Sequence, residues 1–180
     1  MSKKFQKISE EVIHQNPHWA YKCDNILVDD KESKYFYVDI VGNTVIVPVL
    51  DDGRIVLVRQ YRYLRDRYSV EFPGGKIEAD ETPAQSAIRE LKEETGFESS
   101  NFSKLGEFEP DSGVCRDLCH VFLANEIGGA GAQQLEDNED IEILLRRPEE
   151  INEMIKRGEI WQGHALAAWS LVRDFIGKRS

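Results

Sequence analysis

Two stretches rich in β-branched apolar residues dominate the first half of the chain. They span residues 44–50 and 54–60, and Asp51-Asp52-Gly53 separates them. β-branched side chains favour strands, and an Asp-Gly step between two such runs is a strong signal for a hairpin. The pattern therefore predicts a hairpin, in which Pro48 marks a bulge or the end of a strand.

Weaker patterns predict the remaining elements. Short apolar runs indicate further strands at 35–41, 69–72, 105–108, 119–124 and 141–145. Apolar residues at helical spacing indicate helices at 83–95, 148–157 and 164–176. This order is typical of an α+β fold, here a mixed α/β/α sandwich in which helices cover a sheet. We expect residues 1–42 to form a small N-terminal β subdomain and residues 43–180 to form the main domain.

The helix at 83–95 has predictable ends. Thr82 is suited to the N-cap, Pro83 to the first helical position, and Gln85 completes a capping box. Gly96 is suited to end the helix as a C-terminal cap. Four apolar residues at helical spacing predict the face that packs on the core. They are Ala84, Ala87, Ile88 and Leu91.

The other side of this helix carries Arg89, Glu90, Glu93 and Glu94. Glu90 and Glu94 are four residues apart, so their like charges face each other and destabilise the bare helix. A hard cation such as Mg²⁺, which prefers carboxylate oxygens, would offset that repulsion. Arg89 lies one turn before Glu93 and can pair with it. A solvated acidic surface is the alternative interpretation of the same pattern.

Composition limits the classes of protein to which the chain can belong. Its 180 residues suit one domain of ordinary size, and a formal net charge of −10 disfavours binding to nucleic acid. No apolar stretch approaches the ~20 residues of a membrane span, and no apolar run follows the charged start, so we expect a cytoplasmic protein. Three cysteines are too few for a disulfide framework. Cys115, Cys119 and His120 lack the fourth ligand of a tetrahedral metal site.

Fixed spacing of several residue types through the helix and the loop before it favours the metal-binding interpretation. The pattern runs Gly75, five residues, Glu81, seven residues, Arg89-Glu90-Leu91, one residue, Glu93-Glu94, one residue, Gly96-Phe97. At average residue usage it should occur by chance at roughly one start position in 10⁸. This stretch resembles the box of the Nudix hydrolases, and we therefore expect a Nudix fold.

The resemblance implies a metal site in which this stretch holds divalent cations on a diphosphate. The implied ligands are the carboxylates of Glu90 and Glu94 and the main-chain carbonyl of Gly74. The expected ion is Mg²⁺, with Mn²⁺ as the substitute. Arg89 would orient the glutamates, and Glu81 would support them or bind metal. Glu93 would be a further ligand or would activate water.

Flanking residues narrow the resemblance to one branch of the family. Residues 58–63, followed by 71–78, are similar to the ADP-ribose pyrophosphatases and nucleoside diphosphate sugar hydrolases. The resemblance implies that Arg62 or Arg59 reaches the substrate's phosphates and that Glu71 contributes to substrate binding. The products would be a nucleoside monophosphate and a sugar phosphate. ADP-ribose and other nucleotide sugars such as GDP-mannose stay open as substrates.

The same branch implies three further features. An acidic loop, here 134–142, supplies the catalytic base, for which Glu136 and Asp137 are candidates, while Glu139 is the metal-associated glutamate. Aromatic residues of an N-terminal sheet stack on the base, which here indicates Trp19 and Tyr21, with core packing as the alternative. A homodimer is expected.

Rival functions within and outside the enzyme class stay open at this stage. A dinucleoside polyphosphate hydrolase is the main enzymatic rival. A sensor that binds a nucleotide without cutting it usually lacks box glutamates, all of which this chain has. The isopentenyl diphosphate isomerase branch requires a catalytic cysteine in a particular context, which neither Cys115 nor Cys119 clearly provides. Trp161 and His164 are interpreted as packing residues of the last helix.

Overall fold

A computed structural model describes residues 3–129, 131–136 and 139–176. The chain divides into two compact units. The first contains Met1–Gly42 with Glu109–Leu118, and the second contains Asn43–Phe108 with Cys119–Ser180. In the described residues, no helix combines the length and apolar character needed to cross a membrane.

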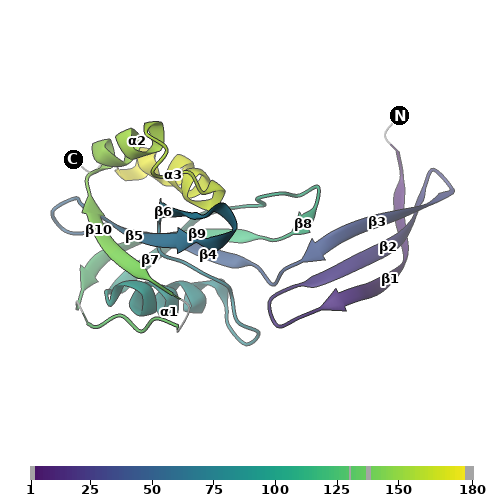
Figure 1. The fold of residues 1–180 in the computed structure, drawn as a ribbon, viewed down its shortest axis with the longest axis horizontal. Helices are drawn as coiled ribbons and strands as arrows, with labels where there is room; N and C mark the ends of the chain where they lie inside the picture. The colour runs from purple at the N-terminus through teal and green to yellow at the C-terminus, as the bar shows by residue number, and fades with distance from the viewer. Residues whose placement is uncertain (1–2, 130, 137–138, 177–180) are drawn as a thin grey trace. The chain divides into compact units, whose positions relative to one another are not determined.

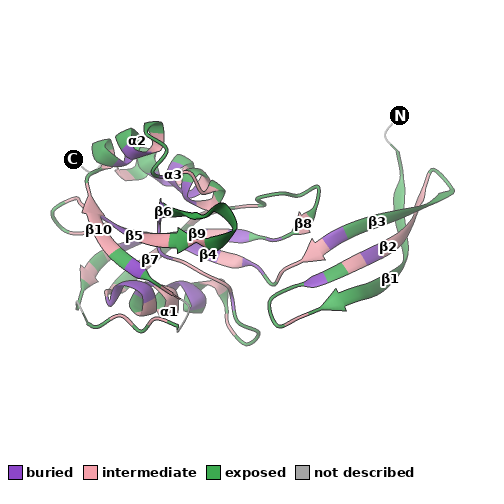
Figure 2. Cartoon of the chain, in the orientation of Figure 1, coloured by how far each residue is buried: buried purple, intermediate pink, exposed green. Residues whose placement is uncertain are grey.

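The first unit is built on a single sheet. Its strands are β1 (Phe5–Gln15), β2 (Ala20–Val28) and β3 (Lys31–Asp39), which pair antiparallel in that order, and β8 (Cys115–Arg116), which runs parallel to β3 (Figure 1). β1 is exposed along its whole length (Figure 2). Residues 1–42 thus contribute three strands of this sheet, and the segment 109–118 contributes the fourth.

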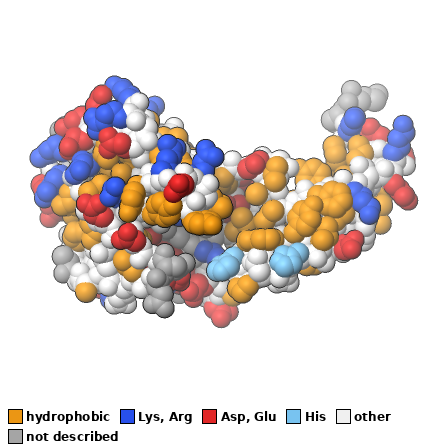
Figure 3. Space-filling view, viewed as in Figure 1, with side chains coloured by type: hydrophobic (Ala, Val, Ile, Leu, Met, Phe, Trp, Pro, Cys, Tyr) orange, Lys and Arg blue, Asp and Glu red, His pale blue; other side chains and the backbone are white. Residues whose placement is uncertain are grey.

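Ion pairs cross-link this sheet where it has few buried apolar side chains. The Lys22 ammonium lies 2.6 Å from the Asp39 carboxylate and 3.0 Å from the Glu10 carboxylate. Arg116 on β8 also pairs with Asp39 through its Nε, at 2.7 Å. These bonds hold the pKa of Asp39 at about 2, with Arg116 as the largest cause. Hydrophobic side chains gather on the face of the sheet seen in Figure 3.

The described residues of the second unit form two three-stranded sheets and three α-helices. The sheet orders are β10-β5-β6 and β4-β9-β7. The strands are β4 (Asn43–Pro48), β5 (Ile55–Arg62), β6 (Arg67–Glu71), β7 (Glu98–Phe108), β9 (Cys119–Gly128) and β10 (Ile141–Arg146). The helices are α1 (Pro83–Thr95), α2 (Pro148–Lys156), α3 (Gly163–Ile176) and the short 3₁₀ helix η1 (Tyr63–Arg65). Within this unit α1 covers one side of the sheets and α2 and α3 cover the other (Figure 1), which confirms the expected α+β sandwich.

β4 and the first half of β5 are buried on both faces. On β4, Val45 and Val47 join the cluster under α2 and α3, whereas Ile46 between them packs with Ala87 and Leu91 of α1. Alternate side chains of a strand point to opposite faces, so a strand between two helical layers is apolar at every position. This burial explains the continuous apolar runs in the sequence.

The predicted hairpin between β4 and β5 is wrong. The turn is present, since Leu50 donates its N–H to the Arg54 carbonyl at 2.8 Å. Only one isolated bridge, between Val49 and Ile55, follows it before the strands separate into different sheets. β4 instead pairs in parallel with β9, whereas β5 pairs antiparallel with β6 and β10. Pro48 is the last residue of β4, which confirms the predicted strand end.

The ends predicted for α1 are confirmed, but its predicted buried face is wrong in part. Thr82 caps the helix in a capping box, and Gly96 ends it with a left-handed backbone. Ala84 is exposed and Ile88 is 51 % exposed. The helix instead buries Ser86, Ala87, Leu91, Glu94 and Thr95. It is thus rotated so that acidic side chains face the interior, where apolar periodicity alone would not place them.

Candidate active site

Glu94 is an acidic side chain buried in the interior of the second unit. Only 4 % of it is exposed, and its carboxylate accepts a hydrogen bond from the Gly74 N–H at 2.8 Å. Burial raises the pKa of Glu94 well above its usual range, and the Gly74 bond opposes this shift. The charges of Glu90 and Glu139 raise the pKa further. A carboxylate in this environment takes up either a proton or a cation.

Glu90 lies one turn earlier on the same face of α1. Its side chain is 13 % exposed, and burial raises its pKa to about 7, against the opposing charge of Arg89. A Cβ added to Gly75 would lie 2.4 Å from the Glu90 carboxylate, and one added to Gly74 would lie 2.1 Å from the Thr44 carbonyl. The two glycines therefore let the chain pass between β4 and the carboxylates of α1.

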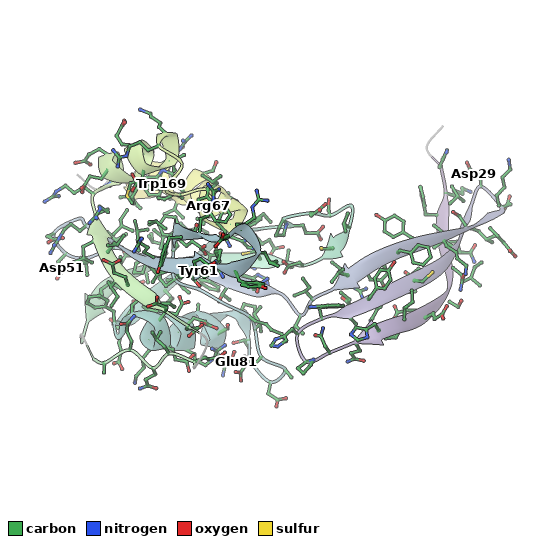
Figure 4. The ribbon with its side chains drawn as sticks, in the orientation of Figure 1. Asp29, Asp51, Tyr61, Arg67, Glu81 and Trp169 are labelled. Carbon is green, nitrogen blue, oxygen red and sulfur yellow. The ribbon has the colours of Figure 1, made fainter. Side chains whose placement is uncertain are left out.

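Arg89 binds three carboxylates with one guanidinium. It donates to Glu81 at 2.7 and 2.9 Å, to Glu90 at 2.8 Å and to Glu93 at 2.9 Å. A further bond of 3.0 Å reaches the Lys76 carbonyl in the loop before the helix. The predicted pair of Arg89 with Glu93 is thus present, and Glu81 lies beside α1 (Figure 4). The planar guanidinium fixes the positions of these carboxylates because its donors point in set directions.

This group of residues fits a magnesium ion by its donor set. Carboxylate oxygens are the ligands that Mg²⁺ takes, and the raised pKa values of Glu90 and Glu94 mark two carboxylates that lack full compensation by nearby cations. In the described part of the chain, no three His, Cys, Asp or Glu side chains converge as metal ligands would. Arg89 donates hydrogen bonds to Glu90 and Glu93, and the Gly74 N–H donates one to Glu94. Each of these carboxylates therefore accepts a hydrogen bond from another part of the protein.

A second ion pair, between Arg62 and Glu71, lies near these glutamates. The Arg62 Nε donates to the Glu71 carboxylate at 2.8 Å, and a second bond joins the Arg62 Nη2 to the other oxygen. Glu71 is buried, at 4 % exposure. The bond to Glu71 is the largest cause that raises the pKa of Arg62, and the charges of Glu94 and Glu139 add to it. Arg62 therefore lies within the electrostatic reach of the acidic cluster.

Arg59 occupies a different environment. It pairs with exposed Glu142 at 3.1 Å, and its guanidinium lies 3.9 Å from the centre of the Tyr68 ring. Arg59 and Arg62 are three residues apart on β5, so their side chains leave opposite faces of the strand. The structure thus places Arg62, and not Arg59, with Glu71.

The acidic loop after β9 approaches the same cluster. Glu139 accepts a bond from the Glu136 N–H at 3.0 Å, and its charge contributes to the raised pKa of both Glu90 and Glu94. Glu136 is exposed, whereas Glu139 is half-buried. Asp137, the other predicted base, lies outside the described residues.

Two glutamines that the sequence analysis missed anchor this loop to the end of α1. The Gln134 N–H bonds to the Glu93 carbonyl at 2.8 Å, and the Gln133 side-chain amide bonds to the Glu94 carbonyl at 2.6 Å. The last carbonyls of a helix need such partners. No local pattern identifies these glutamines, since the helix they bind lies about forty residues earlier.

A cavity of about 220 Å³ lies beside the Arg62–Glu71 pair. Gly74 and Gly75 form part of its wall, and Gln162 and His164 at the start of α3 form another part. No sequence pattern predicts a role for Gln162, and His164 is expected from the sequence only to be a packing residue of the last helix. The His164 ring does pack on Phe108, with 5.6 Å between ring centres, but it also lines this cavity.

Trp19 and Tyr21 belong to the first unit. They are 40 % and 36 % exposed, so neither is a core residue of the chain by itself. The Trp19 ring lies 5.6 Å from that of His14, and the Tyr21 ring stacks on Phe36 at 6.1 Å.

Comparison with known proteins adds independent information. Residues 41–169 match the model of the NUDIX domain family. The chain is 29 % identical to the ADP-ribose pyrophosphatase of Bacillus subtilis over 87 % of this chain and 88 % of that protein. It is 32 % identical to the GDP-mannose pyrophosphatase of Enterobacter sp., over 69 % of each chain. Its fold is similar to that in a crystal structure of an ADP compounds hydrolase, with a TM-score of 0.82, 17 % identity and coverage of 98 % and 96 % of the two chains.

Proposed function

The chain belongs to the Nudix family, and we propose that it hydrolyses the pyrophosphate bond of a nucleoside diphosphate sugar with Mg²⁺. The substrate is ADP-ribose or a related nucleotide sugar such as GDP-mannose, and the products are a nucleoside monophosphate and a sugar phosphate. The observation that carries the proposal is the pair of buried carboxylates, Glu90 and Glu94, beside the Gly74-Gly75 turn. The names of two relatives, an ADP-ribose pyrophosphatase and a GDP-mannose pyrophosphatase, support the substrate class.

Residues of α1, of the turn before it and of the acidic loop would hold the metal. Glu90 and Glu94 would supply carboxylate oxygens, Gly74 its main-chain carbonyl, and Glu139 a further carboxylate. When bound, Mg²⁺ would neutralise charge on the diphosphate oxygens and acidify the attacking water. Mn²⁺ offers similar ligand preferences and is the expected substitute.

The remaining residues orient the reacting groups. Arg89 keeps Glu90 and Glu93 in place through its fork of donors. Arg62, fixed by Glu71, binds phosphate oxygens, for which a guanidinium has matching geometry. A loop carboxylate takes the proton of the attacking water. Glu136 and Asp137 are the candidates for this base, with Glu93 as the alternative.

We also propose that the protein forms a homodimer and that Trp19 and Tyr21 contact the substrate's base. Their exposure in the single chain supports a role outside core packing. Light scattering coupled to size-exclusion chromatography tests the dimer. Alanine at either position should raise KM for a nucleotide sugar, and an unchanged KM for both variants would contradict the contact with the base.

The central test uses purified protein, Mg²⁺ and a panel containing ADP-ribose, GDP-mannose, other nucleotide sugars and diadenosine tetraphosphate. We expect release of a nucleoside monophosphate from one nucleotide sugar class, and Glu94→Gln should reduce kcat/KM by at least roughly 100-fold, since even partners of metal ligands contribute 10–100-fold. Preferred cleavage of diadenosine tetraphosphate would overturn the substrate class. Tight binding without cleavage would identify a sensor.

A further inference from the structure

The cavity beside Arg62 and Glu71 has the size and polarity of a site for one sugar ring. Its volume of about 220 Å³ lies below the ~300–1,000 Å³ of pockets that enclose a whole drug-sized ligand. Arg62 and Glu71 neutralise each other on its wall. Phe72, which also lines it, stacks its ring on Trp169 in the core and is thus not presented for stacking with a base. A small neutral polyol suits these properties, and the phosphate next to it is the group that Arg62 would bind.

The start of α3 holds two polar side chains at this cavity in a fixed arrangement. The Gln162 side-chain oxygen accepts the Ala165 N–H at 2.9 Å and so caps the helix. Its amide nitrogen lies 3.3 Å from the His164 Nδ1. An amide nitrogen can only donate, so Nδ1 accepts and the ring proton is assigned to Nε2. Phe108 packs against the same ring.

A sugar ring requires both donors and acceptors from the protein, because each hydroxyl donates and accepts. Gln162 and His164 place an amide and an imidazole on the wall of this cavity, and Glu71 places a carboxylate there. Gly74 and Gly75 line the same cavity and contact the carboxylates of α1. A group bound here is therefore adjacent to the position at which the diphosphate would be held.

We propose that Gln162 and His164 bind hydroxyl groups of the sugar attached to the distal phosphate, and so determine which nucleotide sugar is preferred. This inference rests on the proposed pyrophosphatase function. The same hydroxyl chemistry exists on the ribose of the nucleoside, and the substrates of the test separate the two sources. The side chains touch the substrate away from the reacting phosphorus, so they act mainly on KM.

The test compares variants on substrates with and without the distal sugar. His164→Leu removes the ring nitrogens but keeps bulk, and Gln162→Ser removes the amide but keeps a good helix cap. Ser170→Ala, at an exposed position of α3, is the matched control, and thermal unfolding checks the fold of each variant. The substrates are the preferred nucleotide sugar, its 2′-deoxynucleoside analogue, and the nucleoside diphosphate β-methyl ester, in which methyl replaces the sugar.

We expect both cavity variants to lose roughly 2- to 12-fold in kcat/KM on the nucleotide sugar, mainly through KM, because one neutral hydrogen bond is removed. On the methyl ester they should equal the wild-type protein. Equal losses on both substrates would overturn the inference while leaving the pyrophosphatase function intact. If the variants lose kcat/KM on every substrate except the 2′-deoxy analogue, the cavity binds the ribose of the nucleoside. That outcome would also overturn the inference. If the wild-type protein cuts no nucleotide sugar, the proposed function itself fails.

Discussion

Removing divalent metal should make the stability of this protein fall as the pH rises from 5.5 to 8.5. The cause is Glu90, whose pKa is raised by burial from 4.5 to about 7 in the folded protein. A carboxyl group with a raised pKa favours the folded state in its protonated form. Its contribution is fully present below pH 4.5, the ordinary value, and is lost as the pH rises through about 7. Glu94 acts in the same direction, since its pKa is also raised by burial.

The size of the effect follows from the shift of Glu90. The pKa of Glu90 rises by 2.5 pH units, from 4.5 to about 7, but only about 1.5 of these units lie above pH 5.5, where the measurement starts. Each unit corresponds to about 1.4 kcal/mol, so the loss between pH 5.5 and 8.5 amounts to about 2 kcal/mol. For a chain of this length, 1 kcal/mol changes the melting temperature by about 2–4 °C, which gives a decrease of about 4–8 °C. Saturating Mg²⁺ should reverse most of this decrease in melting temperature, because the cation binds the ionised carboxylates of the folded state.

The assay is thermal unfolding followed by circular dichroism at several pH values, in EDTA and in Mg²⁺. Glu90→Gln should flatten the dependence in EDTA because an amide does not ionise. Glu98→Gln, an exposed carboxylate just beyond the same helix, is the control and should keep the wild-type slope. A metal-free protein whose melting temperature is constant or rises from pH 5.5 to 8.5 would refute the reasoning, as would an unchanged slope in Glu90→Gln.

Three further substitutions test the arrangement around the carboxylates. Arg89→Lys should weaken the activating effect of Mg²⁺ by roughly 10–100-fold in a metal titration, because an ammonium cannot replace the fork of bonds; an unchanged midpoint would contradict this role. Gly75→Ala should lower activity and melting temperature, since its Cβ would lie 2.4 Å from a carboxylate, whereas Gly128→Ala, with no atom within 4 Å of its Cβ, should change neither. Arg62→Ala should raise KM for the substrate by roughly 10-fold or more, given the ~1.5–3 kcal/mol of a charged hydrogen bond, and Arg59→Ala should not; equal effects in steady-state kinetics would refute the assignment.

Features set by local interactions could be predicted from the sequence. The ends of α1 depend on contacts within a few residues, namely the capping box of Thr82 with Gln85 and the left-handed backbone of Gly96. The acidic cluster could be predicted for the same reason, because the spacing of one continuous segment places Glu90 and Glu94 one turn apart. Both features need no knowledge of the rest of the chain.

Features set by distant partners could not be predicted. The turn after Leu50 has the residues of a hairpin, but β4 pairs with β9, whose first residue is Cys119. Gln162 is separated from Arg62 by one hundred residues, and neither position carries a pattern that indicates the shared cavity. Pairings of this kind depend on which faces of the strands and helices are still exposed once the layers have assembled. The periodicity of apolar residues within one element gives no information about those faces.

The rotation of α1 shows how function overrides the hydrophobic pattern. Burying Ile88 in place of Glu94 would follow that pattern and would avoid the desolvation of a carboxylate, yet Ile88 stays exposed. Two apolar contacts, through Ala87 and Leu91, and the caps at both ends, each of which contributes about 1 kcal/mol, hold the helix in this orientation. The carboxylates are thereby fixed before a cation binds, so little reorganisation is needed on binding. We therefore expect stability and activity to oppose each other at Glu94: glutamine should make the metal-free protein at least as stable at pH 8 while abolishing most turnover.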